Sequence, residues 1–178
     1  MGKGQGKSSA RGGGGGGSKS PVTKESTLAK EEAAIKGNNF ETGIVVDANG
    51  KVLVRNTGDG SEVKFSKADT AAMKDNTLTH NHPEGSTFSP ADVELATKYG
   101  LSEIRAVSSN KTFSLTRVAN KRGKNQFSID YKDAMRREAN RLSLDIMSDR
   151  AFNTKMNTFR SNWLKSNAST YGYSYSEG

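Results

Sequence analysis

The chain contains only two histidines, His80 and His82, and one residue separates them. On a β-strand, residues i and i+2 point to the same side, so both imidazoles can face one point. A carboxylate follows at Asp92, three residues after Ser89. Two histidines and one carboxylate suit a divalent metal such as zinc, and three protein ligands leave a fourth position for water. The sequence therefore predicts a zinc (Zn²⁺) site built from His80, His82 and Asp92.

Each of these residues also has an ordinary structural explanation. Asp92 could be a residue of the first helical turn that the helix dipole favours. The two histidines could be exposed, or they could bind loop backbone. The metal site therefore depends on the elements that bring the three side chains together.

The segment 77–79 predicts a short strand that leads into His80. Ser89 is a good N-cap and Pro90 suits the first helical position, so a helix should begin there, run to Tyr99 and end at Gly100. A strand followed by a loop and a helix can turn Asp92 back over the two rings. The site would then lie at the carboxyl end of the strand and the first turn of the next helix.

The remaining elements predict an α/β (α+β) fold, with a small mixed sheet flanked by helices. Asn49-Gly50 is a strong type I′ hairpin signal, and Ser66 is a good N-cap. The other expected elements are a helix at 23–36, strands at 42–47, 52–54 and 62–65, a helix at 66–73, and a hairpin of strands 104–107 and 112–115. From Ile129 to Trp163 apolar residues recur at helical intervals, which predicts one long C-terminal helix, or two with a break near Ser148-Asp149.

The segment from Thr79 to Asp92 reads THNHPEGSTFSPAD. It resembles the signature of the JAMM/MPN metalloprotease superfamily, including its RadC-like branch: His-x-His-Pro, a loop, then Ser-x-x-Asp. The resemblance covers residues 40–117, and the loop is one residue shorter than is usual in the family. It implies a JAMM/cytidine-deaminase-like core, with His80, His82 and Asp92 as zinc ligands and Ser89 as a group that stabilises the tetrahedral intermediate.

The family also places a glutamate before a strand as general base. Glu41 matches this position, since Gly43-Ile44-Val45 follow it. Zinc would acidify water and polarise the scissile carbonyl. Glu41 would then pass the proton of the attacking water to the leaving amine. Glu62 and Glu84 are the alternatives for this role, with Glu41 preferred because a base needs a rigid support.

Composition and charge limit the other possibilities. The chain has 178 residues, no cysteine and a formal net charge of +8. The absence of cysteine excludes disulfides and thiolate-bound zinc, and no apolar run approaches the ~20 residues of a membrane span. No apolar core follows Lys3, Lys7 and Arg11, so we expect no secretory signal. The run Gly12–Gly17 lacks the context of a phosphate-binding loop.

We therefore expect four segments: a disordered Gly/Ser/Lys-rich linker (1–22), an N-terminal helix (23–39), the metal-binding core (40–117) and a basic helical extension (118–178). The expected activity is zinc-dependent hydrolysis of a peptide or isopeptide bond in a protein or peptide substrate. We expect a cytoplasmic protein, in a bacterial or phage-infected cell, or one associated with a virus particle.

Two other functions stay open. A nucleic-acid-binding module or metal-dependent nuclease is suggested by basic residues past the core, and phosphate contacts would make its binding salt-dependent. These residues are Lys121, Arg122, Lys124, Lys132, Arg136, Arg137 and Arg141. A structural or toxin-like module is suggested by a weaker resemblance of the same motif to C-terminal domains of phage head-morphogenesis and toxin-associated proteins. In that case the long helix would contact an assembly partner or a second copy.

Overall fold

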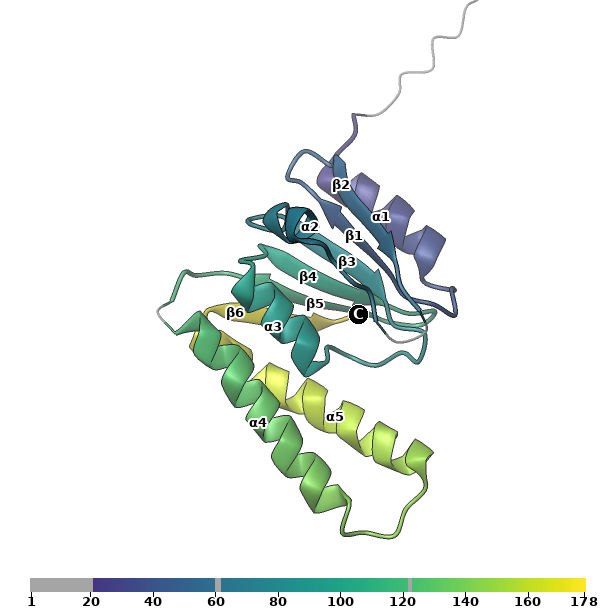
Figure 1. Cartoon of the computed structure of the whole chain (residues 1–178), viewed down its shortest axis with the longest axis vertical. Helices are drawn as coiled ribbons and strands as arrows, with labels where there is room; N and C mark the ends of the chain where they lie inside the picture. The colour runs from purple at the N-terminus through teal and green to yellow at the C-terminus, as the bar shows by residue number, and fades with distance from the viewer. Residues whose placement is uncertain (1–20, 60–61, 122) are drawn as a thin grey trace, which may run out of the picture.

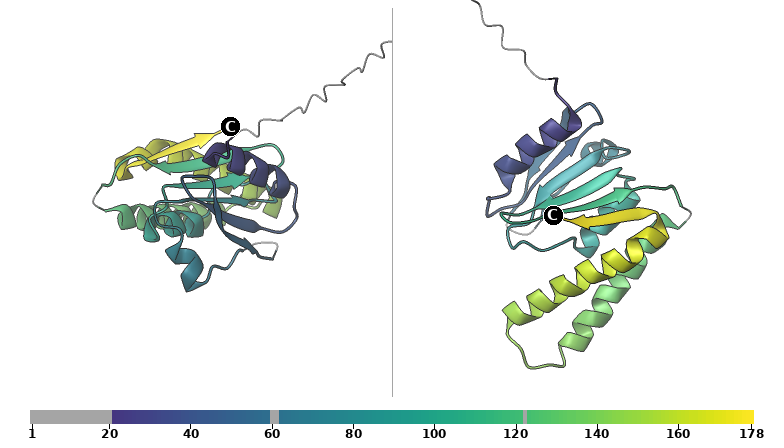
Figure 2. Two further views of the ribbon diagram at one scale, coloured as in Figure 1. Left: turned by 90° about the horizontal axis from the view of Figure 1, so that it is seen from above. Right: turned by 180° about the vertical axis from the view of Figure 1, so that it is seen from behind.

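A computed structural model of the chain describes residues 21–59, 62–121 and 123–178. The expected linker up to residue 20 and Arg122 of the basic cluster lie outside them. The described chain forms a six-stranded mixed sheet with helices on both faces (Figures 1 and 2). The predicted α/β (α+β) class, a mixed sheet flanked by helices, is confirmed.

The sheet has the order β2-β1-β3-β4-β5-β6. Its strands are β1 (Thr42–Val46), β2 (Val52–Thr57), β3 (Thr77–Asn81), β4 (Glu103–Val107), β5 (Thr112–Arg117) and β6 (Tyr173–Glu177). Only the β3–β4 pair is parallel among these neighbours. A parallel pair needs a crossover, and helix α3 (Pro90–Lys98) supplies it. The carboxyl end of β3 therefore lies beside the loop that leads into α3.

The two faces of the sheet carry separate apolar clusters. Helix α1 (Lys24–Ile35) covers one face and packs on Ile44 and Val46 of β1. Val45, between them, belongs to the larger cluster on the other face, together with Leu78 of β3 and residues of α3. This alternation follows from the two-residue period of a strand. It places His80, two residues after Leu78, on the same face as α3.

The expected antiparallel hairpin of β1 and β2 is confirmed, but two details between β1 and α2 are wrong. Asn49 does not have the positive φ that a type I′ turn requires, because the only described non-glycine residue with positive φ is Asp75. Instead the Asp47 carboxylate accepts the backbone N–H groups of Asn49 and Lys51 and fixes a longer loop. Residues 62–65 form no strand, and the Lys64 carbonyl accepts from a side-chain amide of β2 rather than from a backbone ladder.

The C-terminal region folds as a helical hairpin followed by a strand. Helices α4 (Lys124–Leu142) and α5 (Asp149–Asn167) flank a break that begins at Ser143, and Ser148 caps α5. Of the two alternatives, the one with two helices is therefore confirmed. A 3-10 helix, η1 (Ala168–Tyr171), leads into β6, which pairs with β5, so the extension also completes the sheet. No described helix has both the length and the apolar character needed to cross a bilayer.

Capping side chains begin two of the shorter helices as expected. Ser66 caps α2 (Lys67–Ala71) and Ser89 caps α3, and both helices carry an aspartate three residues later that closes a capping box. The two caps have the same chemistry, but only the aspartate of α3, Asp92, faces the two histidines. The cap of α2 is therefore a structural match for the cap of α3 that does not face the histidines.

Candidate metal centre

Strand β3 places the two histidines. His80 lies within β3, paired with Gly43 of β1 and with Ala106 of β4. His82 follows the strand, and its N–H still donates to the carbonyl of Val107 at 2.8 Å, which extends the ladder by one step. Strands on both sides therefore hold this backbone, and the two-residue period points both rings to one side.

The first turn of α3 places Asp92. Its Oδ2 accepts from the Ser89 N–H at 2.7 Å and from the Ser89 hydroxyl at 2.8 Å, and its own N–H donates to Ser89 Oγ at 3.2 Å. Pro90, at the first helical position, needs no hydrogen-bond partner for its nitrogen. The capping box thus holds the Asp92 carboxylate in position through contacts within the protein alone.

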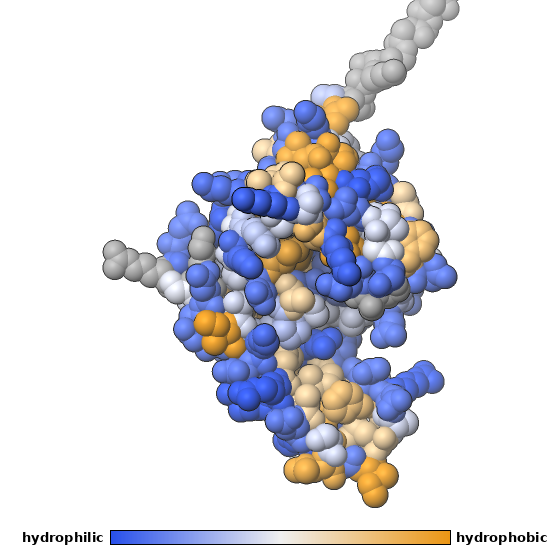
Figure 3. Space-filling view, in the orientation of Figure 1, coloured by the Kyte–Doolittle hydropathy of each residue, from blue (hydrophilic) through white to orange (hydrophobic). Residues whose placement is uncertain are grey.

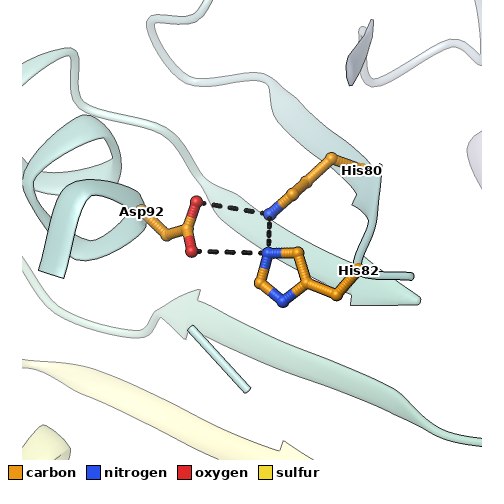
Figure 4. A group of neighbouring side chains, drawn as sticks. All are labelled: His80, His82 and Asp92. Carbon is orange, nitrogen blue, oxygen red and sulfur yellow. Dashed lines mark hydrogen bonds and ion pairs between the residues drawn. The ribbon is translucent and has the colours of Figure 1, made fainter. Parts of the chain in front are cut away.

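The three predicted ligands meet at one point (Figure 4). The Nε2 atoms of His80 and His82 are 2.8 Å apart. Asp92 Oδ1 lies 3.3 Å from Nε2 of His80, and Asp92 Oδ2 lies 3.5 Å from Nε2 of His82. Metal–ligand bonds of about 2.0–2.2 Å bring ligand atoms within roughly 4 Å of one another, and all three separations satisfy this. The group could hold a metal ion.

The surroundings of the Nδ1 atoms indicate which ring nitrogen of each histidine can bind a metal. His82 Nδ1 lies 2.7 Å from the Ser86 carbonyl. Because a carbonyl can only accept, Nδ1 carries the proton and Nε2 keeps its lone pair for a metal. Nδ1 of His80 is buried and makes no regular hydrogen bond, although the backbone of Arg105 lies close to it.

The site is electrostatically coupled. Burial lowers the pKa of His80, but the carboxylates of Asp92 and Glu41 outweigh this and raise that pKa above its ordinary value. Burial and the neighbouring His80 lower the pKa of His82. Burial opposes ionisation of Asp92, yet the two histidines hold its pKa well below the usual range. An anionic Asp92 facing the two rings is an arrangement that favours a bound cation.

Glu41, the predicted base, lies beside the three ligands in one cavity of about 380 Å³. Backbone bonds fix its position just before β1: its N–H donates to the Asp59 carbonyl, and its carbonyl accepts from Gly58. Burial raises the pKa of Glu41, with nearby Asp92 adding to this effect and His80 opposing it. Glu62 and Glu84 line the same cavity but are exposed.

Ser89 also lines this cavity. Its hydroxyl hydrogen is directed to Asp92 Oδ2, so the hydroxyl orients the carboxylate in this arrangement. A role for Ser89 as hydrogen-bond donor to an oxyanion requires that this bond be exchanged. Its predicted role as N-cap is confirmed.

The loop between His82 and Ser89 is held by residues that sequence reasoning did not single out for this role. The buried Tyr131 of α4 donates to the Phe88 carbonyl at 2.7 Å. Asn157 of α5 accepts the Thr87 N–H at 2.8 Å, and the Tyr175 hydroxyl of β6 bonds Thr87 Oγ1 at 2.8 Å. We call Tyr131, Asn157 and Tyr175 the loop clamp. Tyr131 belongs to the apolar stripe of α4, but nothing marks Asn157 in the sequence.

Several members of the predicted basic cluster have partners among the described residues. Arg136 and Arg141 pair with acidic residues of their own helix, Asp133 and Glu138. Lys121 donates to backbone carbonyls after α5. The side chain of Lys124 lies outside the described residues. Helix α4 is therefore a mixed-charge surface over the part that the structure describes.

No protein-family description, curated protein or solved structure matches this chain.

Proposed function

We propose that this protein is a zinc-dependent hydrolase that cuts an amide bond of a peptide or isopeptide. The observation that carries the proposal is the convergence of His80 Nε2, His82 Nε2 and a carboxylate of Asp92 inside an open cavity. Three protein ligands beside a cavity fit a catalytic metal site, which keeps one position open, better than a closed structural site.

The donor set favours zinc over magnesium. Two neutral imidazoles and one carboxylate are borderline ligands that suit zinc, whereas magnesium prefers oxygen ligands and keeps several waters. When bound, zinc would supply Lewis-acid polarisation of the carbonyl and acidify water at neutral pH.

The chain's own residues would handle the proton and the substrate. Glu41 faces the same cavity, and its raised pKa suits a group that accepts a proton from the attacking water and delivers it to the leaving amine. Ser89 would hold Asp92 in place and, after exchanging that bond, could donate to the developing oxyanion. The Ser86 carbonyl would keep His82 in its metal-binding tautomer.

The cavity offers no support for the nuclease alternative. Phosphodiester substrates need cationic contacts, and no described lysine or arginine lines the cavity. The assembly alternative is favoured by one observation: Leu144 and Ile146, in the turn between α4 and α5, are 86% and 107% exposed. This turn is the apolar lower end of the molecule in Figure 3. A Leu144→Ser/Ile146→Ser variant with unchanged elution in size exclusion would remove support for self-association there.

The proposed metal site is tested by a matched pair of variants. Asp92→Asn removes the acidic ligand, whereas Asp69→Asn alters the same capping-box position in α2, where Asp69 accepts the Ser66 N–H. Calorimetric titration should give one zinc ion per chain for the wild type and for Asp69→Asn. Binding should weaken by at least about 10-fold for Asp92→Asn, as for loss of a metal ligand or its support. No zinc binding by the wild-type protein would refute the proposal.

The proposed reaction is tested on zinc-loaded protein with a mixture of peptides, analysed by mass spectrometry. Cleavage that depends on zinc and is strongly reduced in Glu41→Gln would support an amide hydrolase. Zinc binding without cleavage of any peptide or isopeptide in the mixture would leave a metal-binding protein and count against the hydrolase.

A further inference from the structure

The cavity at the metal site has a charge opposite to that of the whole chain. The protein carries a formal net charge of +8, yet four carboxylates and no described lysine or arginine line this cavity. The carboxylates belong to Glu41, Glu62, Glu84 and Asp92. Lysine and arginine are common in this chain, but none of those described lines the cavity. The lining therefore favours a positively charged group in the substrate.

The four carboxylates lie at different depths. Asp92 is at the predicted metal position, and Glu41 is partly buried beside it. Glu62 and Glu84 are exposed and come from separate segments, before α2 and after β3. Glu62 is close enough to contribute to raising the pKa of Glu41. The acidic groups therefore extend from the metal position outward to the rim.

Apolar side chains also line the cavity. Phe65 and Leu95 are partly buried, Leu78 is fully buried, and Val63 stands beside Glu62. A surface of this kind favours the methylene groups of a long side chain, while the rim carboxylates favour a positive charge at its end.

A bound divalent ion does not reverse this preference. Its two charges are outnumbered by the four carboxylates of the cavity when all are ionised. Asp92, the one carboxylate among the candidate ligands, would compensate part of the charge of the metal. The rim formed by Glu62 and Glu84 would therefore stay negative in the metal-bound protein.

We infer that the substrate carries a cationic side chain with an aliphatic stem, lysine or arginine, next to the amide bond that is cut. This inference rests on the proposed hydrolase function and names its substrate class. The same rim disfavours a free carboxylate or a phosphate near the cleaved bond, since like charges would meet Glu62 and Glu84. The activity would therefore be that of an endopeptidase or isopeptidase rather than of a carboxypeptidase.

The probes for this inference are three hydroxamates, which bind zinc through the hydroxamate group and place different side chains in the cavity. They are the hydroxamates of N-acetyl-lysine, N-acetyl-norleucine and N-acetyl-glutamate. Norleucine has the aliphatic stem of lysine without the charge. Calorimetry on zinc-loaded protein should show that the lysine compound binds roughly 2- to 30-fold more tightly than the norleucine compound, as two exposed ion pairs allow. The glutamate compound should bind most weakly.

Variants assign the preference to the rim. Glu62→Gln/Glu84→Gln should bring the lysine-to-norleucine ratio close to one, and added salt should reduce the ratio in the wild type. Glu94→Gln is the matched control, because Glu94 is exposed on α3 but does not line the cavity. It should leave the ratio unchanged.

The outcomes separate this inference from the function on which it rests. If the protein binds zinc but binds lysine and norleucine hydroxamates equally, or binds neither, the substrate class is refuted while the metal site stands. If the rim variant keeps the full preference for lysine, the assignment to Glu62 and Glu84 is wrong. If the wild-type protein binds no zinc, the proposed hydrolase fails and this inference fails with it.

Discussion

The loop clamp makes a testable link between the C-terminal helices and the metal site. Tyr131 is fully buried, and its hydroxyl donates to the Phe88 carbonyl at 2.7 Å. Phe88 immediately precedes Ser89, whose hydroxyl and N–H hold Asp92. We predict that Tyr131→Phe, which removes only the hydroxyl oxygen, both destabilises the protein and weakens zinc binding.

The expected size of both effects follows from the burial of the hydrogen bond between Tyr131 and the Phe88 carbonyl. Removing the donor leaves the Phe88 carbonyl in a buried position without its partner, which costs about 1–3 kcal/mol in the free energy of unfolding. If the loop relaxes to recover a partner, zinc must restore the original geometry when it binds. The free energy of zinc binding is then weakened by at most the same about 1–3 kcal/mol, which corresponds to a rise in Kd of up to roughly 5- to 150-fold.

Chemical denaturation and calorimetric zinc titration measure the two effects separately. Tyr171→Phe is the control, because it deletes the same hydroxyl from the C-terminal region, but that hydroxyl bonds Asp130 rather than the loop. The control should leave zinc affinity unchanged. A twofold change in zinc affinity corresponds to only ~0.4 kcal/mol. If Tyr131→Phe lowers stability but changes zinc affinity by no more than about twofold, Tyr131 does not position the metal site.

Three further predictions follow from the site and the fold. Glu41→Gln should keep zinc affinity and lower peptide hydrolysis by about 10²- to 10⁴-fold in steady-state assays, the usual worth of a general base; equal loss of zinc would instead make Glu41 a ligand. Zinc affinity should fall as the pH drops through the raised pKa of His80, because the proton then competes with the metal; calorimetry from about pH 5.5 to about pH 8, which brackets the ordinary pKa of histidine of about 6.5, would show no slope if this is wrong. Gly50→Ala should cost more than about 1 kcal/mol in denaturation, because Gly50 has φ +83° and a Cβ there would lie 2.5 Å from a backbone oxygen. Gly37→Ala, which meets nothing within 4 Å, should change stability by less than about 0.5 kcal/mol.

The convergence of the three candidate ligands could be predicted from the sequence, because each part of the arrangement has a local cause. A strand period of two residues aligns His80 with His82, and Ser89-Pro90 fixes where the helix begins. Asp92 then has to lie in the first helical turn. These rules act over a few residues, so they hold without knowledge of the whole fold.

Features set by distant contacts could not be predicted in the same way. Residues 62–65 have the composition of a strand, but the side-chain amide of Asn56 donates a hydrogen bond to the carbonyl of Lys64. That carbonyl is therefore not paired in a backbone ladder. The turn after β1 was expected from Asn49-Gly50, yet the carboxylate of Asp47 decides its length. Asn157 contacts Thr87 across 70 positions of the chain, and no local pattern reports such a contact.

The single tryptophan of the chain makes the packing of the C-terminal hairpin observable. Trp163 stacks near Phe127 and Tyr171, and its ring lies 5.1 Å from that of Tyr131, centroid to centroid. Intrinsic fluorescence excited at the indole band would therefore report the docking of α5 against α4, not the state of the far strands β1 and β2. Because Tyr131 touches both this indole and the loop before α3, an emission change on adding zinc would reveal that the two ends of the domain respond together.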